Sequence, residues 1–151
     1  ALVNAAGTSL KMGSGVAGAL KRAAGSGLND EAVSKGPVDL GGVATTDAYD
    51  LDATYVIHAA AMPSGGSSTA KSIRDATRNA LVEADELDCE SLVLPAIGCG
   101  IAGFDFEEGV RIICETISDF DATKLSDVRL IAYSDEDYER IRRVAGEVRD
   151  A

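Results

Sequence analysis

Short apolar, β-branched stretches alternate with stretches of helical periodicity along the whole chain. This alternation is typical of an α/β protein whose sheet is covered by helices on both faces. It predicts strands at residues 1–6, 42–46, 54–59, 91–95 and 128–133, each bounded by turn residues. It also predicts helices at 16–24, from a cap at 29–31 to 35, from the end of the loop 63–68 to about 87, over 106–117 and from 135 onward.

The length of the chain suits a single domain. Its 151 residues and 15.6 kDa are enough for one well-buried core. Neither a repeat nor a linker interrupts the pattern, so we expect one domain over residues 1–151. The first six residues already read as a strand, with no Met and no preceding turn. We therefore expect that the domain lacks its N-terminal strand.

The net charge of −11, from 14 Lys and Arg against 25 Asp and Glu, limits the partners. Such a field repels phosphate backbones and anionic lipid, so we expect neither nucleic acid as main ligand nor a membrane. A small phosphorylated ligand is still compatible, because backbone dipoles can hold it. The acids are mostly Asp, as on the surfaces of salt-adapted proteins, although many ordinary soluble proteins are also acidic.

The three cysteines, Cys89, Cys99 and Cys114, show no paired spacing, and His58 is the one histidine of the chain. This set gives no zinc pattern, and we expect no metal and no cofactor. Unpaired cysteines favour a reducing cytoplasm as the location. No apolar run approaches the roughly 20 residues that a membrane-spanning helix needs.

Two glycine-bearing loops stand between a predicted strand and a predicted helix, at residues 13–18 and 98–103. Backbone N–H groups at a helix N-terminus are unpaired, and glycine lets an anionic oxygen approach them closely. Two such loops can hold a diphosphate without a lysine. The first also matches G-x-G-x-x-G, but no second strand with a ribose-binding acid follows about 20 residues later. The sequence contains no G-x-x-x-x-G-K-[ST] phosphate loop.

Four blocks, at residues 3–6, 13–19, 55–58 and 95–103, resemble macro domains in the same order and spacing, and the resemblance covers nearly the whole chain. It implies a three-layer α-β-α macro-domain fold with a mixed central sheet. Macro domains bind ADP-ribose, and some hydrolyse ADP-ribose that is linked to proteins or small groups. By this resemblance the ADP-ribose-binding residues are Asn4, Gly13, Ser14, Gly15, Val16, Ala17, Ile97, Gly98, Cys99, Gly100, Ile101, Ala102, Phe104 and Tyr133.

The resemblance also implies roles within this set. The two loops hold the diphosphate, and the second loop also wraps the distal ribose. Tyr133 packs on adenine, unless it is a core aromatic, and Phe104 either contacts the distal ribose or packs within the loop. Asn4 and His58 read as structural residues, and Cys99 reads as a small filler rather than as a thiolate stabilised by the helix N-terminus.

Three departures from the family pattern concern catalysis. Gly7 replaces the second Asn of N-A-A-N, Ala17 stands where hydrolytic members carry an acid, and Ala102 stands where many members place Tyr. The Asp that reads the adenine amino group normally lies upstream of the N-A-A block. The catalytic residues therefore stay unknown. We expect a module that binds ADP-ribose, a related ADP-ribosyl metabolite or an ADP-ribosylated molecule.

The first alternative is a hydrolase of ADP-ribose esters, ADP-ribosyl-protein or ADP-ribose 1''-phosphate that uses an ordered water. The second alternative is a site that has decayed or shifted to a different nucleotide or to a protein partner.

Overall fold

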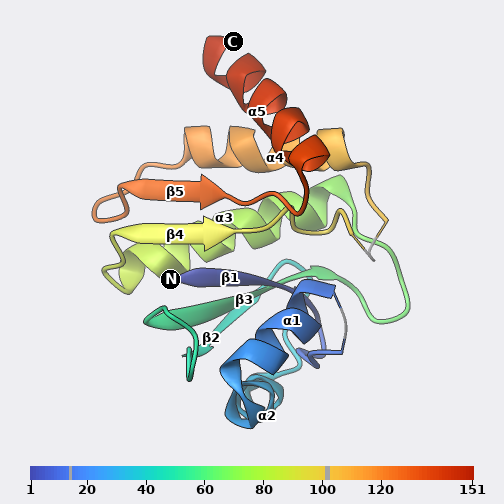
Figure 1. Cartoon of the computed structure of the whole chain (residues 1–151), viewed down its shortest axis with the longest axis vertical. Helices are drawn as coiled ribbons and strands as arrows, with labels where there is room; N and C mark the ends of the chain where they lie inside the picture. The colour runs from blue at the N-terminus through green and yellow to red at the C-terminus, as the bar shows by residue number, and fades with distance from the viewer. Residues whose placement is uncertain (14, 101–102) are drawn as a thin grey trace.

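The computed structural model describes residues 1–13, 15–100 and 103–151. These residues form one five-stranded sheet (Figure 1). Its strands are β1 (Leu2–Gly7), β2 (Val43–Asp47), β3 (Tyr55–Met62), β4 (Ser91–Leu94) and β5 (Asp127–Leu130), in the order β2-β3-β1-β4-β5. β2 runs antiparallel to β3, and the other neighbouring pairs are parallel. The sheet is therefore mixed, as predicted.

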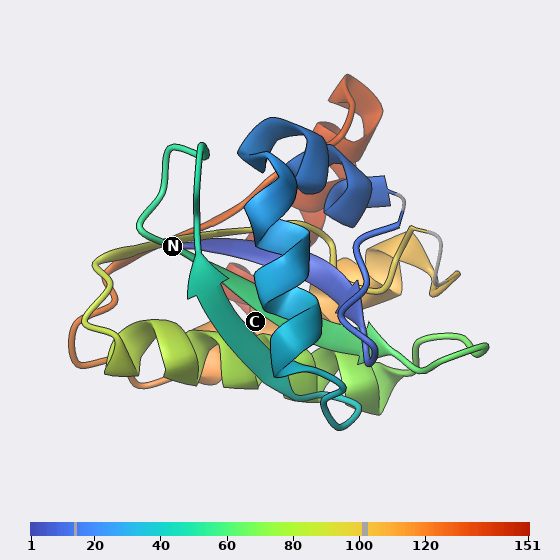
Figure 2. The ribbon, with the colours of Figure 1, turned by 90° about the horizontal axis from the view of Figure 1, so that it is seen from below.

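The helices are α1 (Gly15–Ala24), α2 (Ser26–Lys35), α3 (Ala70–Glu86), α4 (Phe106–Asp119) and α5 (Asp135–Asp150). α1 and α2 lie on one face of the sheet and α3 and α4 on the other, while α5 packs against α4 (Figure 2). Within the described residues, no helix combines the length and the apolar character needed to cross a membrane.

The core is divided by the sheet, because successive strand residues point to opposite faces. On β3, Ile57 and Ala59 belong to the main cluster beneath α3 and α4, whereas Val56 belongs to the cluster beneath α1 and α2. On β1, Val3 and Ala6 divide between the two clusters in the same way. The alternation confirms the expectation of helices on both faces.

The last strand is shorter than predicted. It ends at Leu130, and residues 131–133 leave the sheet. The neighbouring β4 ends at Leu94, whose carbonyl accepts from the Ile131 N–H at 2.9 Å. The next residue, Pro95, has no N–H and cannot continue the ladder. Tyr133 therefore lies beyond the strand rather than at its end.

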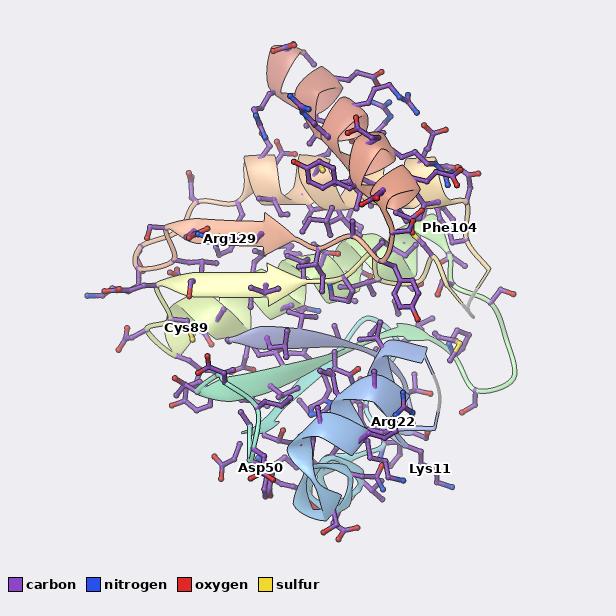
Figure 3. All side chains as sticks on the ribbon, viewed as in Figure 1. Lys11, Arg22, Asp50, Cys89, Phe104 and Arg129 are labelled. Carbon is purple, nitrogen blue, oxygen red and sulfur yellow. The ribbon has the colours of Figure 1, made fainter. Side chains whose placement is uncertain are left out.

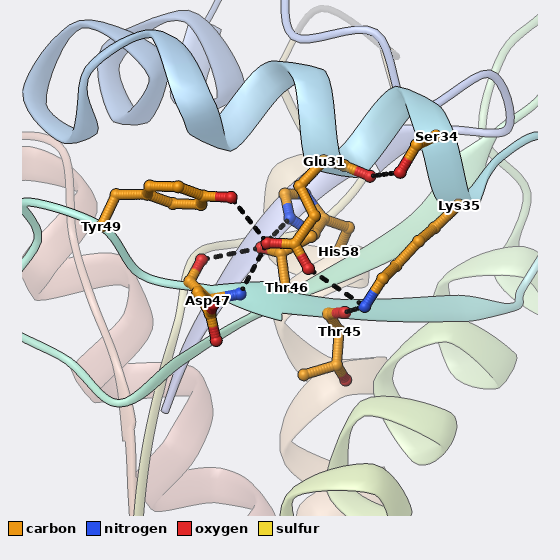
Figure 4. Close-up of polar contacts among 8 residues, drawn as sticks. All are labelled: Glu31, Ser34, Lys35, Thr45, Thr46, Asp47, Tyr49 and His58. Carbon is orange, nitrogen blue, oxygen red and sulfur yellow. Dashed lines mark hydrogen bonds and ion pairs between the residues drawn. The ribbon is translucent and has the colours of Figure 1, made fainter.

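The predicted helix cap at residues 29–31 is wrong, because α2 begins earlier, at Ser26. The Asn29 side chain instead accepts from the Met12 N–H at 3.0 Å, which ties α2 to the loop before α1. Glu31 reaches across to β2 and to Tyr49 in the loop that follows it (Figure 4). It accepts from the Tyr49 hydroxyl at 2.9 Å and from the Asp47 N–H at 3.1 Å, and it pairs with Lys35 at 3.1 Å.

The predicted final helix begins with a side-chain cap. The Ser134 hydroxyl accepts from the Asp137 N–H at 3.1 Å, one turn into α5. The inward face of this helix is narrow. Ile141 and Val144 are buried, but Tyr138 is 56% exposed because the packing against α4 begins one turn later.

Candidate functional site

A cavity of about 550 Å³ opens at the carboxyl ends of β1, β3, β4 and β5. These four strands are parallel, so their carboxyl ends meet along one edge of the sheet, on the right in Figure 1. Figure 3 shows Lys11 on the α1 side of this edge and Phe104 on the α4 side. Ligands of α/β sheets commonly bind outside such an edge.

The first wall of the cavity comes from β1 and the start of α1. It consists mostly of small residues, which leave the backbone accessible: Ala5, Ala6, Gly7, Lys11, Gly13, Gly15, Val16 and Ala17. The first turn of α1 carries no acidic side chain. Its unpaired N–H groups and the positive end of the helix dipole therefore meet no carboxylate of that turn that would repel an anion.

The second wall is the segment between β4 and α4, with Pro95, Ala96, Gly98, Cys99 and Gly100. Gly98 is buried and has a φ of 79°. A Cβ atom there would lie 2.8 Å from Ile73 Cγ1 and 2.9 Å from Ser68 Oγ. The loop closes on itself, because the Phe104 N–H donates to the Gly98 carbonyl at 3.1 Å. Glycine is thus required here both by the backbone conformation and by the space.

The third wall differs in character, being aromatic and acidic. It contains Phe106 at the start of α4 and Ile131, Ala132, Tyr133 and Asp137 at the passage from β5 to α5. Tyr133 is 95% exposed at the rim. The Arg140 guanidinium lies 4.6 Å from the centre of the Phe106 ring, a cation–π contact.

The Cys99 thiol is held in its protonated form. Burial, together with the nearby Asp105 carboxylate, raises its pKa to about 11. Its sulfur packs against α4 so closely that a Cβ at Gly109 would lie 2.2 Å from it. Cys99 therefore acts as a packing residue of the wall and not as a nucleophile.

His58 is fully buried and does not line the cavity. Its Nδ1 is 3.0 Å from Asn4 Nδ2, and its Nε2 is 3.0 Å from the Thr46 hydroxyl oxygen. The Thr46 hydroxyl donates to the Asp47 carbonyl, so it accepts from Nε2–H, and Nδ1 accepts from Asn4. Burial lowers the pKa of His58 to about 4, which keeps this neutral tautomer.

The structure brings eight of the predicted binding residues to the cavity. They are Gly13, Gly15, Val16, Ala17, Gly98, Cys99, Gly100 and Tyr133. Ser14, Ile101 and Ala102 lie outside the described residues.

The other three predicted residues lie behind the wall. Asn4 is 1% exposed and bonds to His58, so it braces β1 against β3. Ile97 is fully buried in the main core cluster, and Phe104 packs against the same cluster. For Phe104, packing is thus the role that the structure shows. None of these three residues is among the described lining of the cavity.

Several lining residues were not predicted from the sequence. A signal existed for those at strand ends, because parallel strands bring their carboxyl ends together: Ala5, Ala6, Gly7, Ala61, Met62, Pro95, Ala96, Ile131 and Ala132. No comparable signal marks Lys11, Phe106 or Asp137. In the part of the chain that the structure describes, no group of three or more His, Cys, Asp or Glu residues is placed to hold a metal ion.

Comparison with known sequences identifies a family. The sequence pattern of the family described as Macro domain matches residues 3–113. An uncharacterized Mycobacterium tuberculosis protein is 44% identical over 113 residues, which are 75% of this chain and 32% of that protein. The chain thus spans about a third of the length of this relative. An uncharacterized Sulfolobus acidocaldarius protein is 36% identical over 148 residues, 95% of this chain and 81% of its own.

Solved structures show the same fold. An Oceanobacillus iheyensis macrodomain mutant with ADPR superposes with a TM-score of 0.88 at 25% identity, covering 99% of this chain and 86% of the other. A Trypanosoma brucei macrodomain in complex with ADP gives a TM-score of 0.85 at 24% identity, covering 96% of this chain and 62% of the other.

Proposed function

Because the chain belongs to the macro domain family, we propose that its cavity binds ADP-ribose or a related ADP-ribosyl metabolite. In this proposal the two glycine-bearing loops contact the diphosphate, and the wall formed by Phe106 and Tyr133 contacts the base. An ADP-ribosylated molecule would bind through its ADP-ribosyl group.

One observation carries the proposal: glycines of two loops that are distant in sequence line the same cavity. Gly13 and Gly15 lie at the start of α1, and Gly98 and Gly100 lie after β4. The two strands that lead into these loops are neighbours in the sheet. Backbone donors from both sides can therefore hold one diphosphate without a basic side chain. The structural neighbours solved with ADPR and with ADP support the same ligand class.

Four residues, Cys99, His58, Gly7 and Ala17, favour binding over turnover. Cys99 stays protonated at neutral pH, and His58 is buried away from the cavity. Gly7 and Ala17 line the cavity but offer no group that could take a proton. The alternative, a hydrolase of ADP-ribosyl esters, ADP-ribosyl-protein or ADP-ribose 1''-phosphate, would need a water held by the ligand diphosphate. It is favoured only by the accessible loop backbone, because positioned donors can stabilise a transition state.

The test is a calorimetric titration with ADP-ribose, with AMP as the comparator ligand. The wild-type protein should bind ADP-ribose much more tightly than AMP. The matched variants are Gly13→Glu, on the cavity wall, and Gly146→Glu, on α5, because a Cβ at either glycine meets no atom within 4 Å. Gly13→Glu should weaken binding by about 100-fold, or about 2.7 kcal/mol, because its carboxylate would repel the diphosphate. Gly146→Glu adds the same charge and should bind like wild type.

Two outcomes would contradict the proposal. If the wild-type protein takes up no ADP-ribose, the ligand is wrong. If Gly13→Glu binds as well as Gly146→Glu, the diphosphate does not lie at the first loop. Chromatography of an ADP-ribosyl ester incubated with the protein then separates the two functions, because only a hydrolase releases free ADP-ribose.

A further inference from the structure

We infer that Ser68 is a positioning residue, whose hydroxyl bonds to the backbone of the Gly98 loop (residues 95–100) once a diphosphate is bound. This inference rests on the proposed function and adds to it a residue behind the cavity wall. Ser68 stands in the loop between β3 and α3, directly before Thr69, the N-cap residue of α3. The two loops meet at the edge of the sheet where the cavity opens (Figure 1).

The Ser68 hydroxyl is buried without a partner. The residue is 7% exposed, and its Oγ forms no hydrogen bond with the described residues. The hydroxyls next to it are satisfied: Thr69 Oγ1 accepts from the Ser72 N–H at 3.0 Å, and Ser72 Oγ donates to the Ala61 carbonyl at 2.7 Å. Most buried polar groups of proteins are bonded in this way. The unmet capacity therefore belongs to Ser68 and not to its surroundings.

The Ser68 hydroxyl faces the Gly98 loop. A Cβ atom at Gly98 would lie 2.9 Å from Ser68 Oγ. Gly98 lines the cavity and Ser68 does not, so the hydroxyl lies against the side of the loop that is turned away from the cavity. The Gly98 carbonyl accepts from the Phe104 N–H, and its second lone pair can take another donor. A small shift of the loop is enough to make Ser68 that donor.

A bound diphosphate supplies this shift, because its charge attracts the backbone N–H groups of the Gly98 loop. The new hydrogen bond would exist only in the bound state, so its free energy adds to the affinity. In the free protein the same hydroxyl lowers stability, because its burial is not compensated by a partner. Ser68 should therefore act on stability and on affinity in opposite directions.

The experiment compares Ser68→Ala with wild type by thermal unfolding without ligand and by calorimetric titration with ADP-ribose and with ADP. Without ligand, the variant should unfold at the wild-type temperature or about 2 °C above it. Its affinity for ADP-ribose should fall about fivefold, the scale of one neutral hydrogen bond. Affinity for ADP should fall by the same factor, because ADP carries the same diphosphate.

Two matched variants serve as controls. Ser67→Ala makes the same change at the adjacent exposed serine and should leave both the unfolding temperature and the affinity unchanged. Ser72→Ala removes a buried hydroxyl that is already bonded, so it should lower the unfolding temperature. This second control shows that the measurement detects the loss of a hydrogen bond that exists in the free protein.

Three outcomes would overturn this inference alone. If Ser68→Ala unfolds at a lower temperature or fails to fold, the hydroxyl already stabilises the free protein. If its affinity for ADP-ribose is unchanged, no bond forms on binding. If only ADP-ribose is affected and ADP is not, the diphosphate does not draw the loop to Ser68. If wild type takes up neither ligand, the proposed function falls as well.

Discussion

The region beneath α2 is rich in polar side chains that bond to one another, whereas the cavity wall consists largely of small residues. Beneath α2, polar side chains bond to one another in what we call the polar network: Asn4, Glu31, Lys35, Thr46, Tyr49 and His58. Around the cavity, glycine and alanine replace such side chains, and the first turn of α1 is left without an acidic residue. Both regions flank the same strands, β1 and β3.

This difference separates scaffold from binding surface. A polar group whose partners lie within the protein gains little from a ligand, because its hydrogen bonds are already made. In the polar network the exception among the described atoms is Asn4 Oδ1, which is buried without a partner. A backbone donor on the cavity wall still has capacity to offer. We therefore expect changes in the polar network to alter stability and not affinity, and changes on the cavity wall that leave the packing intact to do the reverse.

The largest expected effect comes from Gly109→Ala. This change lies behind the cavity wall, and it disturbs the packing and should therefore lower stability. The new methyl group would overlap the Cys99 sulfur, so the unfolding free energy should fall by about 3 kcal/mol. Cys99→Ala removes the obstructing atom, and the double variant should regain most of that loss. Urea unfolding of the two single variants and the double variant measures the coupling. Strictly additive losses would show that the two side chains do not compete for this space.

The next effect concerns His58, in the centre of the polar network. Burial lowers its pKa from 6.5 to about 4 in the folded protein. The Glu31 charge raises this pKa and the Lys35 charge lowers it, both by smaller amounts. Above pH 6.5 the histidine is neutral in both states and has no effect. As the pH falls towards 4, the unfolded chain takes up the proton first, so stability is lost. Between pH 8 and pH 5 the loss should be about 2 kcal/mol.

Urea unfolding across this pH range tests the prediction for His58, with His58→Gln as the reference. The difference in stability between wild type and variant should shrink as the pH falls, because the glutamine cannot be protonated. A constant difference would mean that folding leaves the pKa of His58 unchanged. Affinity for ADP-ribose should not follow this titration, because the imidazole does not reach the cavity.

The sequence predicted the layers and the two glycine loops because both depend on local patterns. Helical and strand periodicities persist over several residues, and glycine between a strand and a helix marks a close approach of backbone. Tertiary partners have no such signature. Asn29 looks like a helix cap, yet it bonds to Met12 seventeen residues earlier. Asp137 reads as one of three acids at a helix start, and only the passage from β5 to α5 places it on the cavity.

The predicted binding residues that do not line the cavity show the same limit of prediction from local sequence patterns. Asn4 is part of a motif whose neighbours, Ala5 and Ala6, do line the cavity. Sequence spacing does not reveal that the Asn4 amide is taken up by His58, because the two residues become neighbours only when β1 pairs with β3. Phe104 and Phe106 are only two positions apart, and the start of α4 decides which of them reaches the cavity.

A smaller effect is expected from Glu31→Gln, at the outer part of the polar network. The neutral amide loses its ion pair with Lys35 and weakens the bond from the Tyr49 hydroxyl. Because the pair is partly exposed, the loss of stability should be about 1 kcal/mol. Thermal unfolding measures it, and calorimetry should find unchanged affinity for ADP-ribose. A drop in affinity without a drop in stability would reverse the roles that we assign to the two regions.

The smallest expected effect comes from Ser134→Ala, which removes a satisfied polar contact on the cavity side. The Ser134 hydroxyl caps α5 and also fixes the backbone of Asp137. Loss of the cap should lower the unfolding free energy by about 0.5 kcal/mol, at the low end for such caps because α5 packs mainly through its later turns. Affinity for ADP-ribose should stay unchanged, because Ser134 does not line the cavity. A drop in affinity greater than the loss of stability would show that this cap also supports the cavity wall.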